Sequence, residues 1–303
     1  MTSRALCVGI NEFATLPQGS WLSGCVNDAE DMVVALRAHG YAASDVTVLR
    51  DSEATKTAVM EALHGLVERS RPGDQLLFSF SSHGTQVPDL PGTEAAGDEE
   101  YDGLDEAFAC HDIAVGVQGW DRDTVVVDDE LRELFASVAK GVLIEVLLDT
   151  CHSGSGTRDL DDIQQDLLRG RRPRYLPPPT EKALARAREI RAAQAGAPGA
   201  PGAPGAPVEL KALRSLVGSR RGASPVLFAA CRPEQTASDA QFEGRPNGAF
   251  THLFLTALAA HPTASRTDLH KAVTAGLKAQ DFEQRSTLEG PVKAKKAAFG
   301  SLW

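Results

Sequence analysis

Apolar runs alternate with amphipathic patterns through the first half of the chain. Runs that are apolar nearly throughout lie at 4–10, 46–50, 74–84 and 142–149, and helical periodicity appears at 27–40, 56–70 and 128–140. Strands without polar alternation are typical of parallel sheets that are covered on both faces. We therefore predict an α/β fold, with a mostly parallel central sheet of about six strands and helices on both faces.

The segment 155–224 interrupts this alternation. It contains RGRRPRYLPPP at 169–179, an Arg-rich helical pattern at 181–195 and GAPGAPGAPGAP at 196–207. Four triplets are too few to form a collagen triple helix, so we interpret the repeat as a semi-extended spacer. After it, we expect a strand and polar loop within 224–239, helices at 248–260 and 267–279, and an edge strand at 291–299.

These patterns predict one domain over residues 1–303. We expect it to consist of a larger part (1–154), an irregular basic and Gly-Ala-Pro linker (155–224) and a smaller part (225–303) that continues the same sheet.

Composition excludes several classes of function. The net charge of −10 argues against nucleic acid as the main partner, because phosphate binding needs a basic surface. The N-terminus lacks a secretory signal pattern, and no run reaches the roughly 20 apolar residues of a membrane span. An odd number of scattered cysteines favours a reducing compartment, so we expect a cytoplasmic protein. These cysteines are Cys7, Cys25, Cys110, Cys151 and Cys231.

Two apolar runs end in residues that could carry out nucleophilic chemistry. FSFSSHG places His83 after one run, and LLDTCHSG places Cys151 after another. The carboxyl ends of parallel strands meet at one sheet edge, where a histidine could activate a thiol and later protonate a leaving amine. Backbone N–H groups at Gly84 and Cys151 could then stabilise an oxyanion.

Three simpler interpretations remain open for these residues. Cys151 could be a small buried apolar residue, and His83 an ordinary buried polar residue. A zinc site formed by His83, Cys151 and His152 lacks a fourth ligand at a typical spacing.

Several motifs together resemble a known family. They are GCVNDA at 24–29, SSHG at 81–84, DTCHSG at 149–154, ACRPEQTASD at 230–239 and GAFTHLFLTAL at 248–258. In this order they resemble the metacaspases and the bacterial caspase-like cysteine peptidases (peptidase family C14, clan CD). The resemblance implies a caspase-like three-layer sandwich and a cysteine endopeptidase whose catalytic dyad is Cys151 and His83. Residues 1–154 would correspond to a large subunit and 225–303 to a small one.

The resemblance also implies a pocket for the residue that precedes the scissile bond. The resemblance implies that this pocket is lined by Asp28, Ser81, Asp149 and Asp239. An acidic pocket selects a cationic side chain through charge-assisted hydrogen bonds, so we expect cleavage after Arg or Lys. For Asp28 taken alone, a helix cap is the alternative role.

Acidic clusters at 97–106 and 125–130 indicate a possible calcium site, although such clusters are usually solvated loops. The resemblance implies calcium activation, with ligands at Asp98, Asp128, Asp129 and Asp159. Asp102 or Asp105 could take the place of Asp98. No other cofactor is expected.

Basic residues in the linker are candidates for self-cleavage, since exposed Pro-rich stretches are readily cut. They are Arg169, Arg171, Arg172, Arg174, Arg220 and Arg221. A flexible basic loop without processing is the alternative. We expect protein or peptide partners with a basic residue before the scissile bond, and a monomer. A silent interaction module and a caspase-fold peptidase of other specificity, such as an asparaginyl cleaver, are the rival functions.

Overall fold

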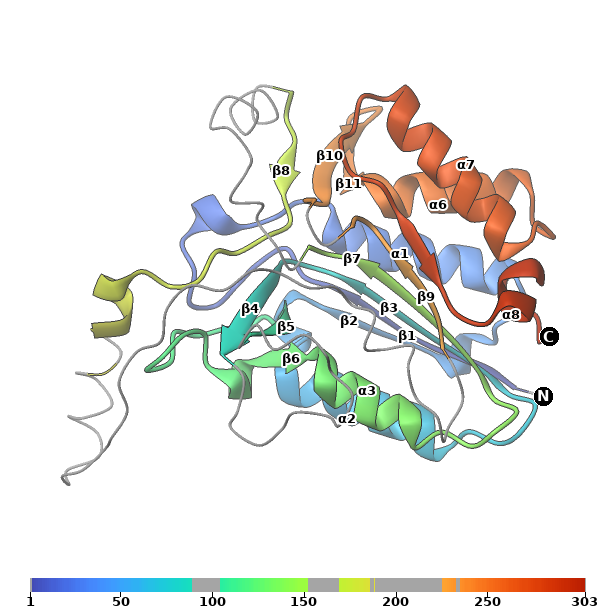
Figure 1. Ribbon diagram of the computed structural model, residues 1–303, viewed down its shortest axis with the longest axis horizontal. Coiled ribbons are helices and arrows are strands. Elements are labelled where there is room, and N and C mark those ends of the chain that lie inside the picture. Colours follow the sequence, from blue (N-terminus) through green and yellow to red (C-terminus); the bar gives the residue numbers. More distant parts are fainter. Residues whose placement is uncertain are drawn as a thin grey trace.

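A six-stranded sheet forms the centre of the protein, in a computed structural model that describes residues 2–88, 104–151, 169–185, 188, 225–232 and 235–302. Its strand order is β12-β9-β7-β3-β1-β2, and every neighbouring pair is parallel except β12 with β9 (Figure 1). The strands are β1 (Ser3–Gly9), β2 (Val46–Arg50), β3 (Gln75–Ser81), β7 (Leu143–Asp149), β9 (Val226–Ala229) and β12 (Thr287–Glu289).

Helices cover both faces of this sheet, as predicted (Figure 1). On one face lie α2 (Lys56–Glu68) and α3 (Asp128–Ala136), and on the other α1 (Cys25–Ala38), α6 (Ala249–Ala260) and α7 (Arg266–Ala279). Successive residues of β1 alternate between the two cores: Leu6 and Val8 belong to one, Ala5 and Cys7 to the other. The predicted three-layer α/β architecture is therefore confirmed.

Two small sheets adjoin the central one. One contains β4 (Gly84–Pro88), β5 (Leu104–Ala109) and β6 (Val125–Val127). The other contains β8 (Arg172–Pro173), β10 (Ser238–Phe242) and β11 (Arg245–Gly248). Because β4 begins three residues after β3 ends, the first of these sheets extends from the carboxyl edge of the central sheet. Neither was predicted, since their strands are short and all but β6 are mixed in polarity.

The expected edge strand at 291–299 is wrong. The antiparallel edge strand is β12, and the later residues form the short helix α8 (Val292–Lys296). Pro291 explains the difference, because it has no N–H for a ladder and is well suited to begin a helix. Of the expected helix at 181–195, residues 181–185 and 188 are helical, and the remainder and the Gly-Ala-Pro repeat lie outside the described residues.

Short 3-10 helices complete the described part of the chain, at Gln18–Ser20, Ala43–Asp45, Asp51–Glu53 and Arg122–Thr124. All five cysteines are buried, and none of them forms a disulfide. Within the described residues, no helix has the length and apolar character needed to cross a membrane.

A buried ion pair fastens the C-terminal segment to the sheet. Arg266, at the start of α7, places its Nε 2.6 Å from the carboxylate of Glu145 on β7, and both side chains are fully buried. The same guanidinium donates to the carbonyls of Ala294 and Ser301, and Glu145 accepts from the N–H of Gly300. Burial raises the pKa of Glu145, so the carboxylate depends on these partners to remain charged.

Candidate active site

The register of the central sheet aligns the ends of the two motif-bearing strands. Ser81 on β3 is paired directly with Asp149 on β7. His83 and Cys151 each follow two residues later, so both emerge from neighbouring parallel strands at the same edge of the sheet. This is the edge at which open α/β sheets bind ligands.

His83 is buried in a neutral state. Its Nε2 lies 2.7 Å from the carbonyl oxygen of Ser20, and its ring lies 5.3 Å from that of Phe13, centroid to centroid. Burial lowers the pKa of His83 to about 4. Because a carbonyl only accepts, Nε2 carries the proton, and Nδ1 of the neutral ring has a free lone pair. Nδ1 is buried and has no hydrogen-bond partner among the described residues.

Cys151 is also buried, and its thiol is held by neighbouring groups. Sγ donates a hydrogen bond of 2.6 Å to the carbonyl oxygen of Gln235. A hydrogen bond with Cys151, together with burial, raises the pKa of Cys231 well above its usual range. The sequence patterns assigned Cys231 no part in the site, so they did not predict this neighbour. They also did not predict the backbone carbonyls of Ser20 and Gln235, which no residue pattern reveals.

Two backbone N–H groups converge on one carbonyl oxygen beside the thiol. The carbonyl of Arg174 accepts hydrogen bonds from the N–H of Gly84 at 3.0 Å and from the N–H of Cys151 at 3.2 Å. A Cβ atom at Gly84 would come within 2.1 Å of the Cys151 carbonyl oxygen, so the close approach requires glycine. The two residues predicted to form an oxyanion hole thus bind a peptide carbonyl of the chain itself.

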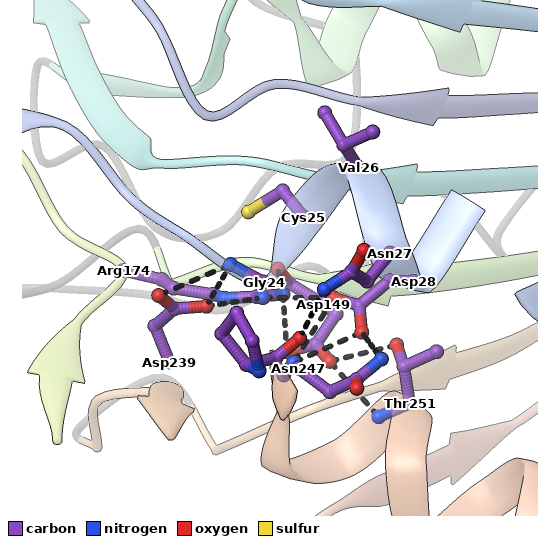
Figure 2. A network of polar contacts seen from close by, with 12 residues as sticks. Gly24, Cys25, Val26, Asn27, Asp28, Asp149, Arg174, Asp239, Asn247 and Thr251 are labelled. Atoms are coloured by element: carbon purple, nitrogen blue, oxygen red, sulfur yellow. Dashed lines mark hydrogen bonds and ion pairs between the residues drawn. The ribbon is translucent and has the colours of Figure 1, made fainter. Parts of the chain in front are cut away.

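The side chain of Arg174 lies among three carboxylates (Figure 2). Its guanidinium nitrogens lie 2.7 Å from Asp28, 3.2 Å from Asp149 and 2.9 Å from Asp239. Arg174 is 0% exposed, so the expectation that the basic Pro-rich stretch is exposed is wrong at this residue. Ion pairing compensates the burial of its charge. We call the site formed by Asp28, Asp149 and Asp239 the primary pocket.

Backbone and side-chain donors fix two of these carboxylates. Asp28, in the first turn of α1, accepts from the N–H of Gly248 and from Nδ2 of Asn247. Asp239 accepts from the N–H groups of Ser23 and Gly24. The helix-cap role weighed for Asp28 does not apply, because the N-cap of α1 is Gly24 and no side chain caps it.

The third carboxylate and the predicted Ser81 lie side by side at the strand ends. Asp149 accepts from both the N–H and the hydroxyl of Thr251 in the first turn of α6. The Ser81 hydroxyl is buried and makes no hydrogen bond within the described part of the chain. Asp28, Asp149 and Asp239 thus meet around one guanidinium, and Ser81 makes no polar contact with it.

Three carboxylates around one guanidinium leave an excess of negative charge. Burial raises the pKa of Asp28 to about 7, and the neighbouring Asp149 adds to the rise, whereas Arg174 opposes it. Such a pocket binds a single cation strongly and disfavours an anion.

The main chain around Arg174 is bound in an extended conformation. Its N–H donates to the Ala237 carbonyl at 2.9 Å, and β8 pairs antiparallel with β10. Beyond Arg174, the N–H of Leu176 donates to the Gly84 carbonyl at 2.9 Å, and Thr85 Oγ1 donates to the Leu176 carbonyl at 2.8 Å. Strand pairing therefore fixes the segment on both sides of the Arg174–Tyr175 bond.

An acidic group lies beside the small β4-β5-β6 sheet. Oxygens of Asp105, Asp128 and Asp129 all lie within 4.8 Å of one another. Asp105 also forms an ion pair of 2.7 Å with Arg122, and Asp129 forms one with Arg132. The structure therefore brings together two of the expected calcium ligands and Asp105, the alternative to Asp98.

The remaining predicted residues are more dispersed. Arg169 and Arg172 are exposed, and Arg171 is partly buried. The predicted residues Asp98, Asp159, Arg220 and Arg221, together with Asp102 and His152, lie outside the described residues.

Comparison with known proteins gives consistent matches. A family model described as "Metacaspase, peptidase C14 domain" matches residues 3–160. Metacaspase-1A of Aspergillus terreus is 30% identical over 282 residues, and Metacaspase-1A of Aspergillus niger is 29% identical over 289 residues. These alignments cover 89% and 91% of this chain, which spans 66% and 67% of the two relatives. A crystal structure of protein GSU0716 from Geobacter sulfurreducens matches with a TM-score of 0.66 and 26% identity, covering 100% of this chain and 99% of that one.

Proposed function

Because the chain belongs to the metacaspase family of cysteine-type peptidases, we propose that it is an endopeptidase that cleaves after Arg or Lys, with Cys151 as nucleophile and His83 as general base and acid. The observation that carries this proposal is the position of Arg174. Its guanidinium fills the primary pocket while its carbonyl oxygen accepts from the N–H groups of Gly84 and Cys151. This is the arrangement that a residue before a scissile bond must adopt.

In the proposed reaction, Sγ of Cys151 bonds to the substrate carbonyl carbon and its proton passes to His83. The oxyanion accepts the hydrogen bonds of the two N–H groups. Breakage of the C–N bond then releases the amine, which takes the proton from His83 and leaves a thioester. Water hydrolyses the thioester through the same proton transfers and restores the thiol. What supports His83 as the base is its neutral ring, which is the form present near pH 7 and which has a free Nδ1 lone pair to accept the proton.

The thiol must be released before it can attack. Its hydrogen bond to the Gln235 carbonyl keeps the proton on sulfur, and a thiol is a much weaker nucleophile than a thiolate. We infer that activation exchanges this hydrogen bond for one to His83, so the described arrangement corresponds to a latent form.

The charge of the primary pocket supports selection of a cationic side chain. Fluorogenic peptides that differ only in the residue before the fluorophore test this directly. We expect turnover of the Arg and Lys peptides, and at least about 100-fold lower kcat/KM for the Asp and Asn peptides. Preferential turnover of the Asn peptide would favour the asparaginyl rival, and preferential turnover of the Asp peptide would contradict the proposed specificity.

An enzyme differs from a silent caspase-like module in the reactivity of its thiol. We expect an Arg chloromethyl ketone to alkylate Cys151 of the wild-type chain, because the pocket delivers the reagent and His83 activates the sulfur. His83→Ala should lose this labelling, while His64→Ala, which changes a histidine on the far helix α2, should keep it. Equal labelling of wild type and His83→Ala would remove His83 from the mechanism.

Self-cleavage at Arg174–Tyr175 is a further part of the proposal. Among the candidate residues that the structure describes, which exclude Arg220 and Arg221, Arg174 is the one whose guanidinium lies in the primary pocket and whose carbonyl accepts from the two N–H groups. Cleavage there would break the chain between the two paired stretches that hold the segment over Cys151. We therefore propose that the segment blocks access to Cys151 and the primary pocket until it is cut.

We also propose that calcium promotes activity through Asp105, Asp128 and Asp129, whose clustered carboxylates suit a hard cation. Calcium titration calorimetry on Cys151→Ala measures binding without self-cleavage. We expect Cys151→Ala to show heat of calcium binding, and we expect Asp128→Asn to abolish it. Asp45→Asn, which changes a carboxylate outside this cluster, should leave calcium binding unchanged. Calcium binding that Asp128→Asn leaves unchanged would show that the site lies elsewhere. Absence of calcium binding by Cys151→Ala itself would contradict a calcium site.

A monomeric, cytoplasmic enzyme completes the proposal. The edge strand β12 has three residues, which offer few backbone groups for pairing with a second copy, and none of the five cysteines forms a disulfide. Sedimentation of the purified chain at increasing concentration tests the monomer, and concentration-dependent dimerisation would contradict it.

A further inference from the structure

A second guanidinium is bound in the same segment, three residues before Arg174. The Cζ atom of Arg171 lies 3.9 Å from the centroid of the Phe282 ring. Its Nη1 donates to the Asp281 carbonyl at 2.7 Å, and its Nη2 donates to the Gln280 carbonyl at 2.7 Å. The aromatic ring covers one planar face of the cation, and the two carbonyls accept from both of its terminal nitrogens.

The end of helix α7 makes these carbonyls available. The N–H of Phe282 donates to the Leu277 carbonyl and that of Asp281 to the Lys278 carbonyl, with Asp281 at φ 54°. This is a Schellman motif, in which the chain turns sharply out of the helix. The carbonyls of Gln280 and Asp281 therefore lie at the negative end of the helix dipole, where a cation is favoured.

The same loop is tied to the nucleophile through one residue. Gln235 donates from Nε2 to the Glu283 carbonyl at 2.7 Å and accepts at Oε1 from the N–H of Arg285 at 2.9 Å. Its own carbonyl accepts the thiol hydrogen bond of Cys151. In the latent arrangement, hydrogen bonds through Gln235 thus connect the loop that carries Phe282 to Cys151.

We propose that the Phe282 ring and the carbonyls of Gln280 and Asp281 form a specificity subsite for an Arg at the fourth position before the scissile bond. The inference rests on the proposed peptidase function and deepens it: preferred substrates carry two guanidinium groups three residues apart. The intervening Arg172 does not define a comparable subsite. Its side chain is exposed, and within the described residues it donates hydrogen bonds to the carbonyls of Trp21 and, at 3.5 Å, Gly19.

Three fluorogenic tetrapeptides test the subsite on the self-processed wild-type chain. They share Arg-Pro-Arg before the fluorophore and carry Arg, norleucine or Ala at the first position. We expect kcat/KM for the Arg peptide to exceed those of the other two by about tenfold. Equal values for all three peptides would overturn the subsite while leaving the proposed function intact. A preference for the norleucine peptide would show that the subsite is apolar. If none of the three peptides is turned over, both the proposed function and the subsite are contradicted.

A variant locates the effect. Phe282→Leu keeps an apolar side chain but removes the aromatic face, so the ratio of kcat/KM for the Arg peptide to that for the Ala peptide should fall from about tenfold towards one. The matched control is Phe242→Leu. The Phe242 ring is a neighbour of Phe282, with 6.2 Å between ring centroids, and its replacement should leave the preference for the Arg peptide unchanged. Turnover of the Ala peptide and thermal unfolding report folding in each variant. An undiminished Arg preference in a folded Phe282→Leu would overturn the assignment.

Discussion

The carbonyl oxygen of Arg174 accepts a hydrogen bond of 3.2 Å from the N–H of Cys151, the residue that we propose as nucleophile. A second hydrogen bond from Gly84, and three carboxylates around the guanidinium, hold the same residue. The chain therefore presents one of its own peptide bonds to the proposed active site. The contacts of this bond indicate which groups should bind the substrate side chain and which should stabilise the oxyanion.

Asp239→Asn should weaken recognition of the cationic side chain. The amide keeps an oxygen that can accept from the N–H groups of Ser23 and Gly24, but it removes one of the charges facing the guanidinium. We expect kcat/KM for an Arg peptide to fall about 100-fold, the scale of losing one partner of a buried ion pair. The control is Glu30→Gln. Glu30 is an exposed acidic residue of helix α1 that pairs with Arg50, so this substitution should leave kcat/KM unchanged. An Asp239→Asn enzyme of wild-type efficiency would show that this carboxylate does not face the substrate.

The pH dependence of cation binding should report Asp28. Its carboxyl has a pKa raised to about 7, so it is protonated below this pH and charged above it. Inhibition of the processed enzyme by benzamidine, a cation without a cleavable bond, should therefore tighten as the pH rises from about 6 to 8. His83 does not titrate in this range, because its pKa is lowered to about 4.

Asp28→Asn provides the control for this assignment. The variant cannot ionise at this position, so its benzamidine inhibition constant should be weaker and flat over the same pH range. A wild-type constant that is also flat would contradict the assignment to Asp28.

Gly84→Ala should disrupt the proposed oxyanion hole. A Cβ atom there would lie 2.1 Å from the carbonyl oxygen of Cys151, so the two N–H groups could no longer converge on one oxygen. Loss of one such donor costs about 100- to 1,000-fold in kcat. Gly65→Ala is the matched control, because a Cβ in that helix meets nothing within 4 Å and should stabilise the fold by about 1 kcal/mol. Turnover near the wild-type rate by Gly84→Ala would exclude this N–H from catalysis.

Arg266→Met should lower the free energy of unfolding of the whole domain. Removal of this guanidinium leaves the Glu145 carboxylate buried without its ionic partner, which costs about 3–5 kcal/mol. Arg50→Met breaks an exposed pair with Glu30 and should cost no more than about 1 kcal/mol. Guanidinium chloride unfolding of the two variants measures the difference, and equal stabilities would contradict the importance of the buried pair.

Much of the fold and part of the site could be predicted from local patterns. The apolar runs that end at Ser81 and Asp149 predict buried parallel strands, and parallel strands bring their carboxyl ends to one edge. This reasoning correctly predicted a common edge for His83 and Cys151. The short strands β4, β5 and β6 escaped prediction because their pairing depends on partners far along the chain and on no periodicity of their own.

The buried state of Arg174 could not be predicted from its neighbours. A basic, Pro-rich stretch is typical of an exposed loop, and hydropathy does not reveal that the compensating charges come from Asp28 and Asp239, distant in sequence. The roles of backbone groups were hidden for a related reason. The carbonyls of Ser20 and Gln235 act through position alone, and any residue type could supply them.

The account depends most on the claim that the Arg174–Tyr175 bond lies in position for attack by Cys151. Intact-mass analysis with N-terminal sequencing of the wild-type chain, incubated with and without calcium, tests this claim. We predict that wild type yields a fragment beginning at Tyr175, that Cys151→Ala and Arg174→Gln remain intact at this bond, and that Arg172→Gln is processed like wild type. Processing of Cys151→Ala at the same bond, or a wild-type chain that hydrolyses Arg peptides yet leaves Arg174–Tyr175 uncut, would contradict it.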